Sequence, residues 1–164
     1  MATLLVISGR NEGEWYSIPE DRPLVVGREE TLIAELLDPA VSRRHFEIRR
    51  NESNDRYYVA DLKSRNGVRV EGKRINGLHP LVDDNLIQVG YTLMSFTIAD
   101  VEDDGDAQQR IREAQERRAK FIATVRAHEA EIEEKARRRD ERNRRARGGK
   151  SSGGFLGGLF RRSS

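Results

Sequence analysis

A hydroxyl, two guanidiniums and an imidazole stand side by side in the segment DPAVSRRHFEIRR, residues 38–50. The polar run Ser42-Arg43-Arg44-His45 comes directly before residues 46–50, where apolar and charged side chains alternate as in a β-strand. A hydroxyl beside a guanidinium offers the donors that phosphate oxygens accept. Solvated loops can have the same composition, so the rest of the sequence must distinguish an anion site from an ordinary loop.

Two other segments place similar groups where an apolar run ends. Gly27-Arg28 follows the run 24–26, and Ser64-Arg65-Asn66-Gly67 follows the run 57–62. The planar, permanently charged guanidinium of Arg28 suits paired contacts to a phosphate. The Asn66 amide can both donate and accept, as a peptide backbone does. Gly67 suits a left-handed turn position, where a side chain would clash.

Each of these groups also has an ordinary structural interpretation. Arg28 alone is compatible with a surface salt bridge, and Ser42 alone is compatible with a turn cap. Asn66-Gly67 alone would be a hairpin turn, which is how we interpret Asn76-Gly77. Only the presence of all three segments in one chain favours a shared site.

The sequence gives little support for catalysis. It contains no cysteine, no phosphate-binding glycine loop and no nucleophile paired with a base. His45, His79 and His128 have no neighbouring ligand residues in the sequence. We therefore expect no enzymatic activity, no metal and no cofactor.

The first hundred residues resemble a chain of short strands. Apolar runs alternate with turn segments rich in Gly, Asn, Asp and Pro, at a spacing typical of a β-sandwich or barrel. The predicted strands are 3–7, 15–18, 24–26, 32–37, 45–49, 57–62, 68–70, 74–75, 86–89 and 93–98. The fold class that these runs indicate is all-β, with about ten or eleven strands.

The remaining residues differ in composition and charge. Residues 1–100 carry 13 basic and 16 acidic residues, whereas residues 101–164 carry 17 and 12. With 35% charged residues and a mean hydropathy of −0.77, the whole chain is too polar for one continuous core. We predict a domain at 1–100, an acidic hinge at 101–106, a charged helix at 107–147 and a disordered Gly/Ser tail at 148–164.

The predicted helix has two interpretations. Its apolar positions fit an interrupted heptad seam, which would allow self-association through a coiled coil. The alternative is a solvated, charged stalk. The positions of the seam are Ile111, Ala114, Phe121, Val125 and Ile132.

The three polar segments resemble the forkhead-associated (FHA) domain, a phosphothreonine-reading β-sandwich. The family pattern runs Gly-Arg, Ser-Arg-x-His and Ser-x-Asn-Gly, and the chain has all three blocks in that order, followed by LVDDNLIQVG at 81–90. The resemblance covers roughly residues 3–99. It implies that the helix and tail follow an FHA-type sandwich.

The resemblance also implies roles for individual residues. Those predicted to bind a phosphopeptide are Arg28, Ser42, Arg43, Arg65 and Asn66. Those predicted to support the site structurally are Gly27, His45 and Gly67. Arg44 is expected to point to solvent.

We therefore expect a phosphothreonine-dependent adaptor in Ser/Thr kinase signalling, located in the cytoplasm, whose partner is a Thr-phosphorylated protein. No apolar run is long enough to span a membrane. One alternative is binding of nucleic acid or another acidic surface through KARRRDERNRRAR, residues 135–147, although base stacking there would lack aromatic side chains. Another is a structural, oligomeric scaffold built on the helix.

Overall fold

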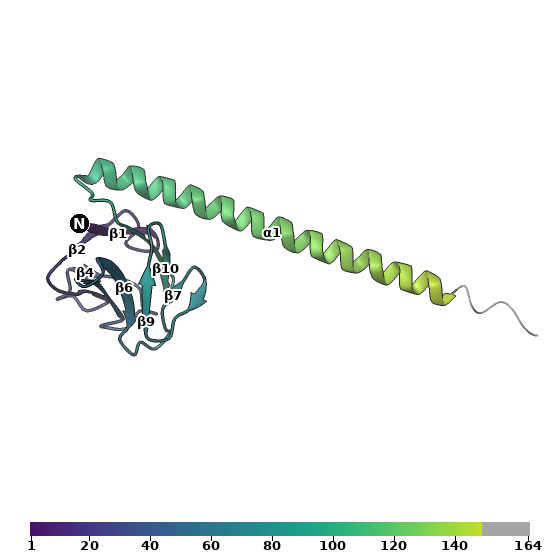
Figure 1. Cartoon of the computed structure of the whole chain (residues 1–164), viewed down its shortest axis with the longest axis horizontal. Coiled ribbons are helices and arrows are strands. Elements are labelled where there is room, and N and C mark those ends of the chain that lie inside the picture. The colour runs from purple at the N-terminus through teal and green to yellow at the C-terminus, as the bar shows by residue number, and fades with distance from the viewer. Residues whose placement is uncertain (149–164) are drawn as a thin grey trace, which may run out of the picture. The chain divides into compact units, whose positions relative to one another are not determined.

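The computed structural model contains a β-sandwich followed by one long helix (Figure 1). It describes residues 1–148, except for the side chains of residues 121, 124–133, 136 and 146–148. The predicted tail therefore lies outside the described residues, apart from Gly148, which ends the helix. None of the helices described is long and apolar enough to cross a bilayer.

Within residues 1–148, eleven strands form two sheets, as the sequence predicts for this fold class. The six-stranded sheet has the order β2-β1-β11-β10-β7-β8, and the five-stranded sheet has the order β4-β3-β5-β6-β9. The strands are β1 Ala2–Ser8, β2 Trp15–Ile18, β3 Leu24–Gly27, β4 Ala34–Glu35, β5 Phe46–Asn51, β6 Arg56–Asp61, β7 Arg69–Val70, β8 Lys73–Arg74, β9 Leu78–Leu81, β10 Leu86–Val89 and β11 Thr92–Thr97. All strand pairs are antiparallel except β3 with β4.

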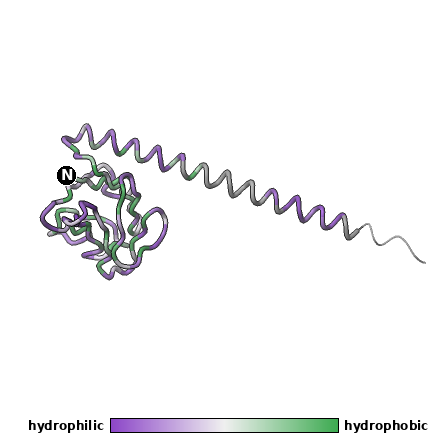
Figure 2. Tube along the Cα trace, viewed as in Figure 1, coloured by the Kyte–Doolittle hydropathy of each residue, from purple (hydrophilic) through white to green (hydrophobic). Residues whose placement is uncertain are grey.

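The main core lies between the two sheets. Alternate residues of each strand point into it, among them Leu4, Val26, Ile48 and Phe96, none of which is more than 3% exposed. Figure 2 shows apolar segments along the strands of the sandwich. The packing follows from the period of two that strand side chains impose.

Strand β1 is buried on both faces, which explains its unbroken apolar run. Leu4 and Val6 face the main core, whereas Leu5 and Ile7 belong to a second cluster on the opposite face. That cluster is completed by the start of helix α1, Asp104–Gly148. A short apolar run between turns is the pattern expected of a strand covered on both sides.

The first turns of α1 belong to the folded domain. Val101, Ala107, Ile111 and Ala114 are all at most 5% exposed in the second cluster. The compact unit accordingly reaches Arg118, and the helix begins at Asp104 rather than at the predicted Ala107. Acidic side chains in the first helical turn favour this start.

Two of the five positions predicted for a coiled-coil seam therefore pack within the domain instead. Ile111 and Ala114 pack against the sandwich and are not available to a partner helix. The side chains of Phe121, Val125 and Ile132 lie outside the described residues. The coiled-coil prediction stands without structural support.

Two strand predictions were inaccurate. The segment 78–81, which is absent from the predicted strands, is strand β9 at the edge of its sheet. Proline is tolerated there because an edge strand has unpaired backbone groups. The predicted strand 32–37 shrinks to β4, because Ile33 and Leu37 are 70% and 54% exposed and do not extend the sheet.

Candidate phosphopeptide site

Three loops meet at one end of the five-stranded sheet. The register pairs Val26 at the end of β3 with Phe46 at the start of β5, and pairs Phe46 with Asp61 at the end of β6. Each strand passes into or out of a loop at this row. The three polar segments of the sequence are therefore brought together by strand pairing alone.

Backbone hydrogen bonds join the first two loops. The Arg28 N–H donates to the Ser42 carbonyl (3.1 Å), and the Glu29 N–H donates to the Arg43 carbonyl (3.2 Å). Gly27 makes this approach sterically possible, since a Cβ there would stand 2.0 Å from the Arg43 carbonyl oxygen. The glycine is thus required by the close approach of the neighbouring backbone.

His45 links the second and third loops from inside the protein. Its ring is fully buried, and its Nδ1 accepts a hydrogen bond from the Ser42 N–H (3.0 Å). Because a backbone N–H can only donate, Nδ1 carries no proton in this arrangement, and Nε2–H donates to the Gly67 carbonyl (3.1 Å). The imidazole therefore sets the spacing of the two loops and has no free nitrogen for a ligand.

The Ser42 hydroxyl is oriented by the third loop. Its Oγ accepts a hydrogen bond from the Arg65 N–H at 3.0 Å. The hydroxyl proton is not used in that bond and can be donated to a ligand. A serine in this position thus ties two loops together and still offers a donor.

The loops enclose a small pocket of about 200 Å³. Of the described residues, those that line it include three arginines and no acidic side chain: Arg28, Pro39, Ala40, Val41, Ser42, Arg43 and Arg65. Arg28, Arg43 and Arg65 are exposed, and none has an ion-pair partner in the described part of the chain. Three unpaired cations around one concavity favour an anionic ligand.

Asn66 lies beside this pocket and lines an adjacent one. Its Nδ2 donates to the Ala40 carbonyl at 2.7 Å. Ala40 lines both pockets, and the second has a volume of about 260 Å³ and includes Gly67 and Arg69. The remaining amide hydrogen and Oδ1 of Asn66 are available to a peptide backbone that runs from one pocket to the other.

The turn that carries Asn66 is held by its own residues. The Ser64 hydroxyl accepts from the Gly67 N–H (2.9 Å), and the Ser64 N–H donates to the Asp61 carboxylate (2.8 Å). Gly67 has φ +76°, and a Cβ on it would stand 2.7 Å from Nε of Arg74. The left-handed backbone favours glycine here, whereas the end of the exposed Arg74 side chain could move aside.

The sequence analysis missed Asp38, which organises the loop before Ser42. The Asp38 side chain is 3% exposed and accepts from the Ala40 N–H, the Tyr91 N–H and the Thr92 hydroxyl, at 2.9, 2.7 and 2.9 Å. The available signal was an aspartate directly before Pro39, a pair that favours a turn. Asp38 anchors the loop to the start of β11.

Two larger pockets lie elsewhere on the sandwich. They have volumes of about 500 and 510 Å³ and share Glu20 and Arg50 in their linings. Both contain acidic side chains, and Arg50 is already paired with Glu20 (3.2 Å) and Asp55 (2.6 Å). A dianion is therefore better matched by the smaller pocket, despite its size.

The segments that form this pocket also match a known protein family. The family model of the FHA domain matches residues 24–90, which include the three polar segments. Comparison with curated proteins found no match. The chain contains an FHA domain.

Solved FHA domains have the same fold. One, from a study of phosphothreonine-dependent FHA domain interactions, is 28% identical with a TM-score of 0.53, covering 61% of this chain and 98% of its own. The FHA domain of CT664 from Chlamydia trachomatis is 26% identical with a TM-score of 0.55, covering 60% and 98%. The FhaA FHA domain, solved with the intracellular domain of Rv3910, is 29% identical with a TM-score of 0.52, covering 58% and 99%.

Proposed function

We propose that this protein is a phosphothreonine-dependent adaptor, which binds a Thr-phosphorylated protein through the pocket of Arg28, Ser42, Arg43 and Arg65. The observation that carries the proposal is a concavity with three exposed, unpaired arginines and an oriented hydroxyl. The site would act in Ser/Thr kinase signalling, since a kinase must supply the phosphate, and we place it in the cytoplasm. No catalytic step is required.

The chemistry of the pocket matches a phosphorylated side chain. Such a group carries about −1.5 to −2 charges at neutral pH and three acceptor oxygens. Arg28 would make a paired, charge-assisted contact with two of these oxygens, and the Ser42 hydroxyl would donate to the third. Arg43 and Arg65 would add positive charge from opposite loops.

Asn66 would hold the peptide backbone next to the phosphate. With one Nδ2 hydrogen bonded to Ala40, its Oδ1 can accept from a peptide N–H and its other hydrogen can donate to a peptide carbonyl. This contact makes binding depend on the peptide as well as on the phosphate. Free inorganic phosphate would therefore bind more weakly than a phosphopeptide.

The family supports threonine as the phosphorylated residue. A solved FHA domain that is 28% identical comes from work on phosphothreonine-dependent interactions. The FHA family model matches residues 24–90, which include the whole site. By resemblance, a small hollow beside the phosphate takes the threonine methyl. We therefore expect phosphothreonine to bind more tightly than phosphoserine in the same peptide.

The expected affinity is modest. Hydrogen bonds to charged groups contribute about 1.5–3 kcal/mol each. Three or four of them, less the entropy lost when a peptide is ordered, give a Kd on the order of 1 μM.

The test is a binding titration of the full chain with peptides selected from a phosphothreonine library. We expect the phosphopeptide to bind and its unphosphorylated form to show no binding at the same concentrations. Arg28→Ala should weaken binding at least tenfold, because the main phosphate contact is lost. Arg49→Ala, which removes an exposed arginine from the face of β5, is the matched control and should leave affinity unchanged. Equal effects of the two substitutions would refute the assigned site.

A further inference from the structure

The pocket beside Asn66 has a positive charge that its own lining does not neutralise. Among the described residues that line it, Arg69 is the one charged side chain. Arg69 is exposed, and within the described residues it forms no ion pair. Its Nη1 donates to the Gly72 carbonyl (3.2 Å), which leaves the N–H groups of Nε and Nη2 for a ligand.

A second arginine stands next to Arg69 on the sheet. The register pairs Gln88 of β10 with Arg69 of β7, and pairs Arg69 with Arg74 of β8. Ile87 and Val70, the neighbours of this row, are buried in the main core, so the row faces outward. Side chains directly opposite each other start about 4.5–5.5 Å apart at Cβ. Two guanidiniums and an amide therefore lie side by side.

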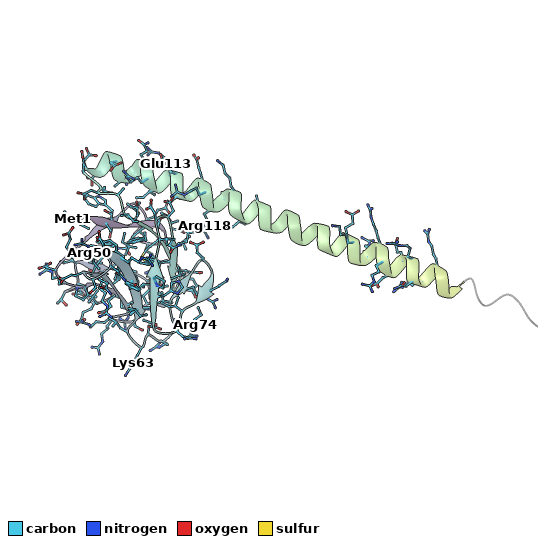
Figure 3. The ribbon with its side chains drawn as sticks, viewed as in Figure 1. Met1, Arg50, Lys63, Arg74, Glu113 and Arg118 are labelled. Atoms are coloured by element: carbon cyan, nitrogen blue, oxygen red, sulfur yellow. The ribbon has the colours of Figure 1, made fainter. Side chains whose placement is uncertain are left out.

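Arg74 also connects this row to the turn that carries Asn66. A Cβ on Gly67 would be 2.7 Å from Nε and 2.8 Å from Nη2 of Arg74, so the guanidinium lies against the turn. Figure 3 shows Arg74 on the same side of the sandwich as Lys63, away from Glu113. The two arginines are thus part of the end of the sandwich where the binding loops meet.

The carboxylates nearest in the fold are already used. Glu71, in the same hairpin as Arg69 and Arg74, accepts from the Leu86 N–H at 2.7 Å. Asp38, beneath the pocket, accepts from three donors of its own loop and of the β10–β11 turn. Like charges directly opposite each other destabilise an antiparallel pair, and no described acidic side chain forms an ion pair with either arginine. An anion bound between the two guanidiniums would remove this repulsion.

The anion can belong to the same peptide as the phosphothreonine. Ala40 lines both the phosphate pocket and the pocket of Arg69, and the Asn66 amide is bonded to its carbonyl. A peptide held at Asn66 therefore passes Arg69 a few residues from its phosphate. Arginine offers paired donors that match the oxygens of a carboxylate or a phosphate.

We propose that Arg69 and Arg74 form a second anion subsite, which selects partners with an acidic side chain or a second phosphate close to the phosphothreonine. This inference rests on the proposed function, because the phosphate pocket must hold the peptide first. It adds a sequence preference that the phosphate pocket alone does not provide.

The test is a positional scan with the full chain and fluorescent phosphothreonine peptides, read by anisotropy. Each residue flanking the phosphothreonine is alanine in the reference peptide and is replaced in turn by aspartate, phosphoserine or lysine. At one position, aspartate or phosphoserine should tighten binding by about threefold or more and lysine should weaken it, a modest effect because both arginines are exposed. The larger of the two gains identifies carboxylate or phosphate as the preferred anion.

Substitutions then assign the preference to the two arginines. The double variant Arg69→Gln, Arg74→Gln should bind the acidic and alanine peptides equally, and Arg69→Glu should prefer the lysine peptide. The matched control is Lys63→Gln, Lys73→Gln, which removes the same charge. Lys73 pairs with the inward-facing Val70, so it lies on the other face of the hairpin from Arg74, and neither lysine lines the two pockets. The control should keep the full preference.

The possible outcomes separate this inference from the proposed function. Phosphate-dependent binding without a preference for an anion at any position would overturn the second subsite and leave the phosphate pocket intact. A preference that survives in the double variant, or that the lysine control loses equally, would also overturn the subsite. If no phosphopeptide binds the unmodified chain, the proposed function is refuted and the subsite with it.

Discussion

At the scale of single residues, the proposed site depends on which polar atoms of Ser42 and His45 are already hydrogen-bonded within the protein. The Ser42 hydroxyl accepts from the Arg65 N–H and retains its proton for a ligand, whereas His45 uses both ring nitrogens within the protein. In the proposed site, Ser42 would therefore contact the ligand, whereas His45 would support the loops. The two residues differ because the Ser42 hydroxyl keeps a donor without a partner in the folded protein, whereas both ring nitrogens of His45 are already hydrogen-bonded.

Ser42→Ala should lower phosphopeptide affinity by about tenfold, since one hydrogen bond to a charged group contributes about 1.5–3 kcal/mol. The same titration with Ser53→Ala is the control, because Ser53 is exposed and lies in the turn between β5 and β6, at the opposite end of these strands from the binding loops. Full affinity in the Ser42 variant would show that the hydroxyl does not contact the phosphate.

Gly27→Ala should destabilise the fold by about 3 kcal/mol, because the new methyl would overlap the Arg43 carbonyl, which accepts the hydrogen bond from the Glu29 N–H. Urea unfolding measures the change. Gly105→Ala, in the first turn of α1, should change stability by less than about 1 kcal/mol, since alanine is the better helix former. A stable Gly27 variant with normal peptide affinity would contradict the role of this close approach.

Asp38→Ala should also destabilise the protein, by about 2 kcal/mol or more, because three donors, among them the buried Thr92 hydroxyl, lose their acceptor. Peptide affinity should fall with it, as the loop that carries Ser42 loses its anchor. Asp21→Ala, at an exposed position, is the comparison in the same urea series. A loss of affinity without any loss of stability would mean that Asp38 acts on the ligand instead.

Residue types and order were enough to predict that the three loops lie together, but not how they are held. Arg28, Ser42 and Arg65 line one pocket, as the motif spacing suggests, whereas Asn66 lines the adjacent one. The role of Asp38 was not foreseen, because its three partners include Tyr91 and Thr92, more than fifty residues away. Contacts at that separation have no local signal in the sequence.

At the scale of elements, the most informative strand is β1. Its run of buried residues needs cover on both faces, and the second face is covered by the start of α1. Hydrogen bonds fix this contact: Gln115 donates to the Ile7 carbonyl (2.8 Å) and Trp15 donates to Asp104 (3.0 Å). The helix propensity of the segment was evident from composition, but its docking was not.

The boundary of the stable domain is therefore expected after Arg118. A fragment of residues 1–118 should unfold cooperatively, whereas a fragment of residues 1–100 should be less stable by about 3 kcal/mol or more, because Leu5 and Ile7 lose their cover and Ile111 is absent. Urea unfolding of both fragments measures the difference. Equal stability would show that the helical contact contributes nothing to the domain.

The correct and the incorrect strand predictions both depend on one signal, the period of two in apolar residues. Patterns of period two predicted the strands that are paired on both sides, such as β5 and β6. They failed for β9, where Pro80 resembles a turn, because sequence alone does not show which strand will be at an edge. Edge position is set by the pairing of the whole sheet.

At the scale of the whole molecule, the proposed site and the start of α1 lie on different sides of the compact unit. Figure 3 places Lys63, which precedes the Ser64–Gly67 turn, on the side of the sandwich away from Glu113 of α1. The binding loops are therefore not covered by the first turns of the helix. An adaptor needs this separation, because one end must stay open to the phosphorylated partner.

Because the proposed site is open, a fragment that lacks most of α1 should keep the phosphopeptide affinity of the full chain. Residues 1–118 should bind a phosphopeptide within about twofold of the full chain, since none of the residues described beyond Arg118 lines the pocket. Parallel titrations of the two proteins with one peptide measure this. A tenfold change in either direction would mean that the remainder of α1 or the tail acts on the site.

The most direct test of the central claim is an NMR titration of the ¹⁵N-labelled full chain with a phosphothreonine peptide and with its unphosphorylated form. The account predicts the largest shift changes at the backbone or side-chain N–H groups of Arg28, Ser42, Arg43, Arg65 and Asn66, and only with the phosphorylated peptide. Equal changes with both peptides, or changes centred on the pocket shared by Glu20 and Arg50, would contradict it.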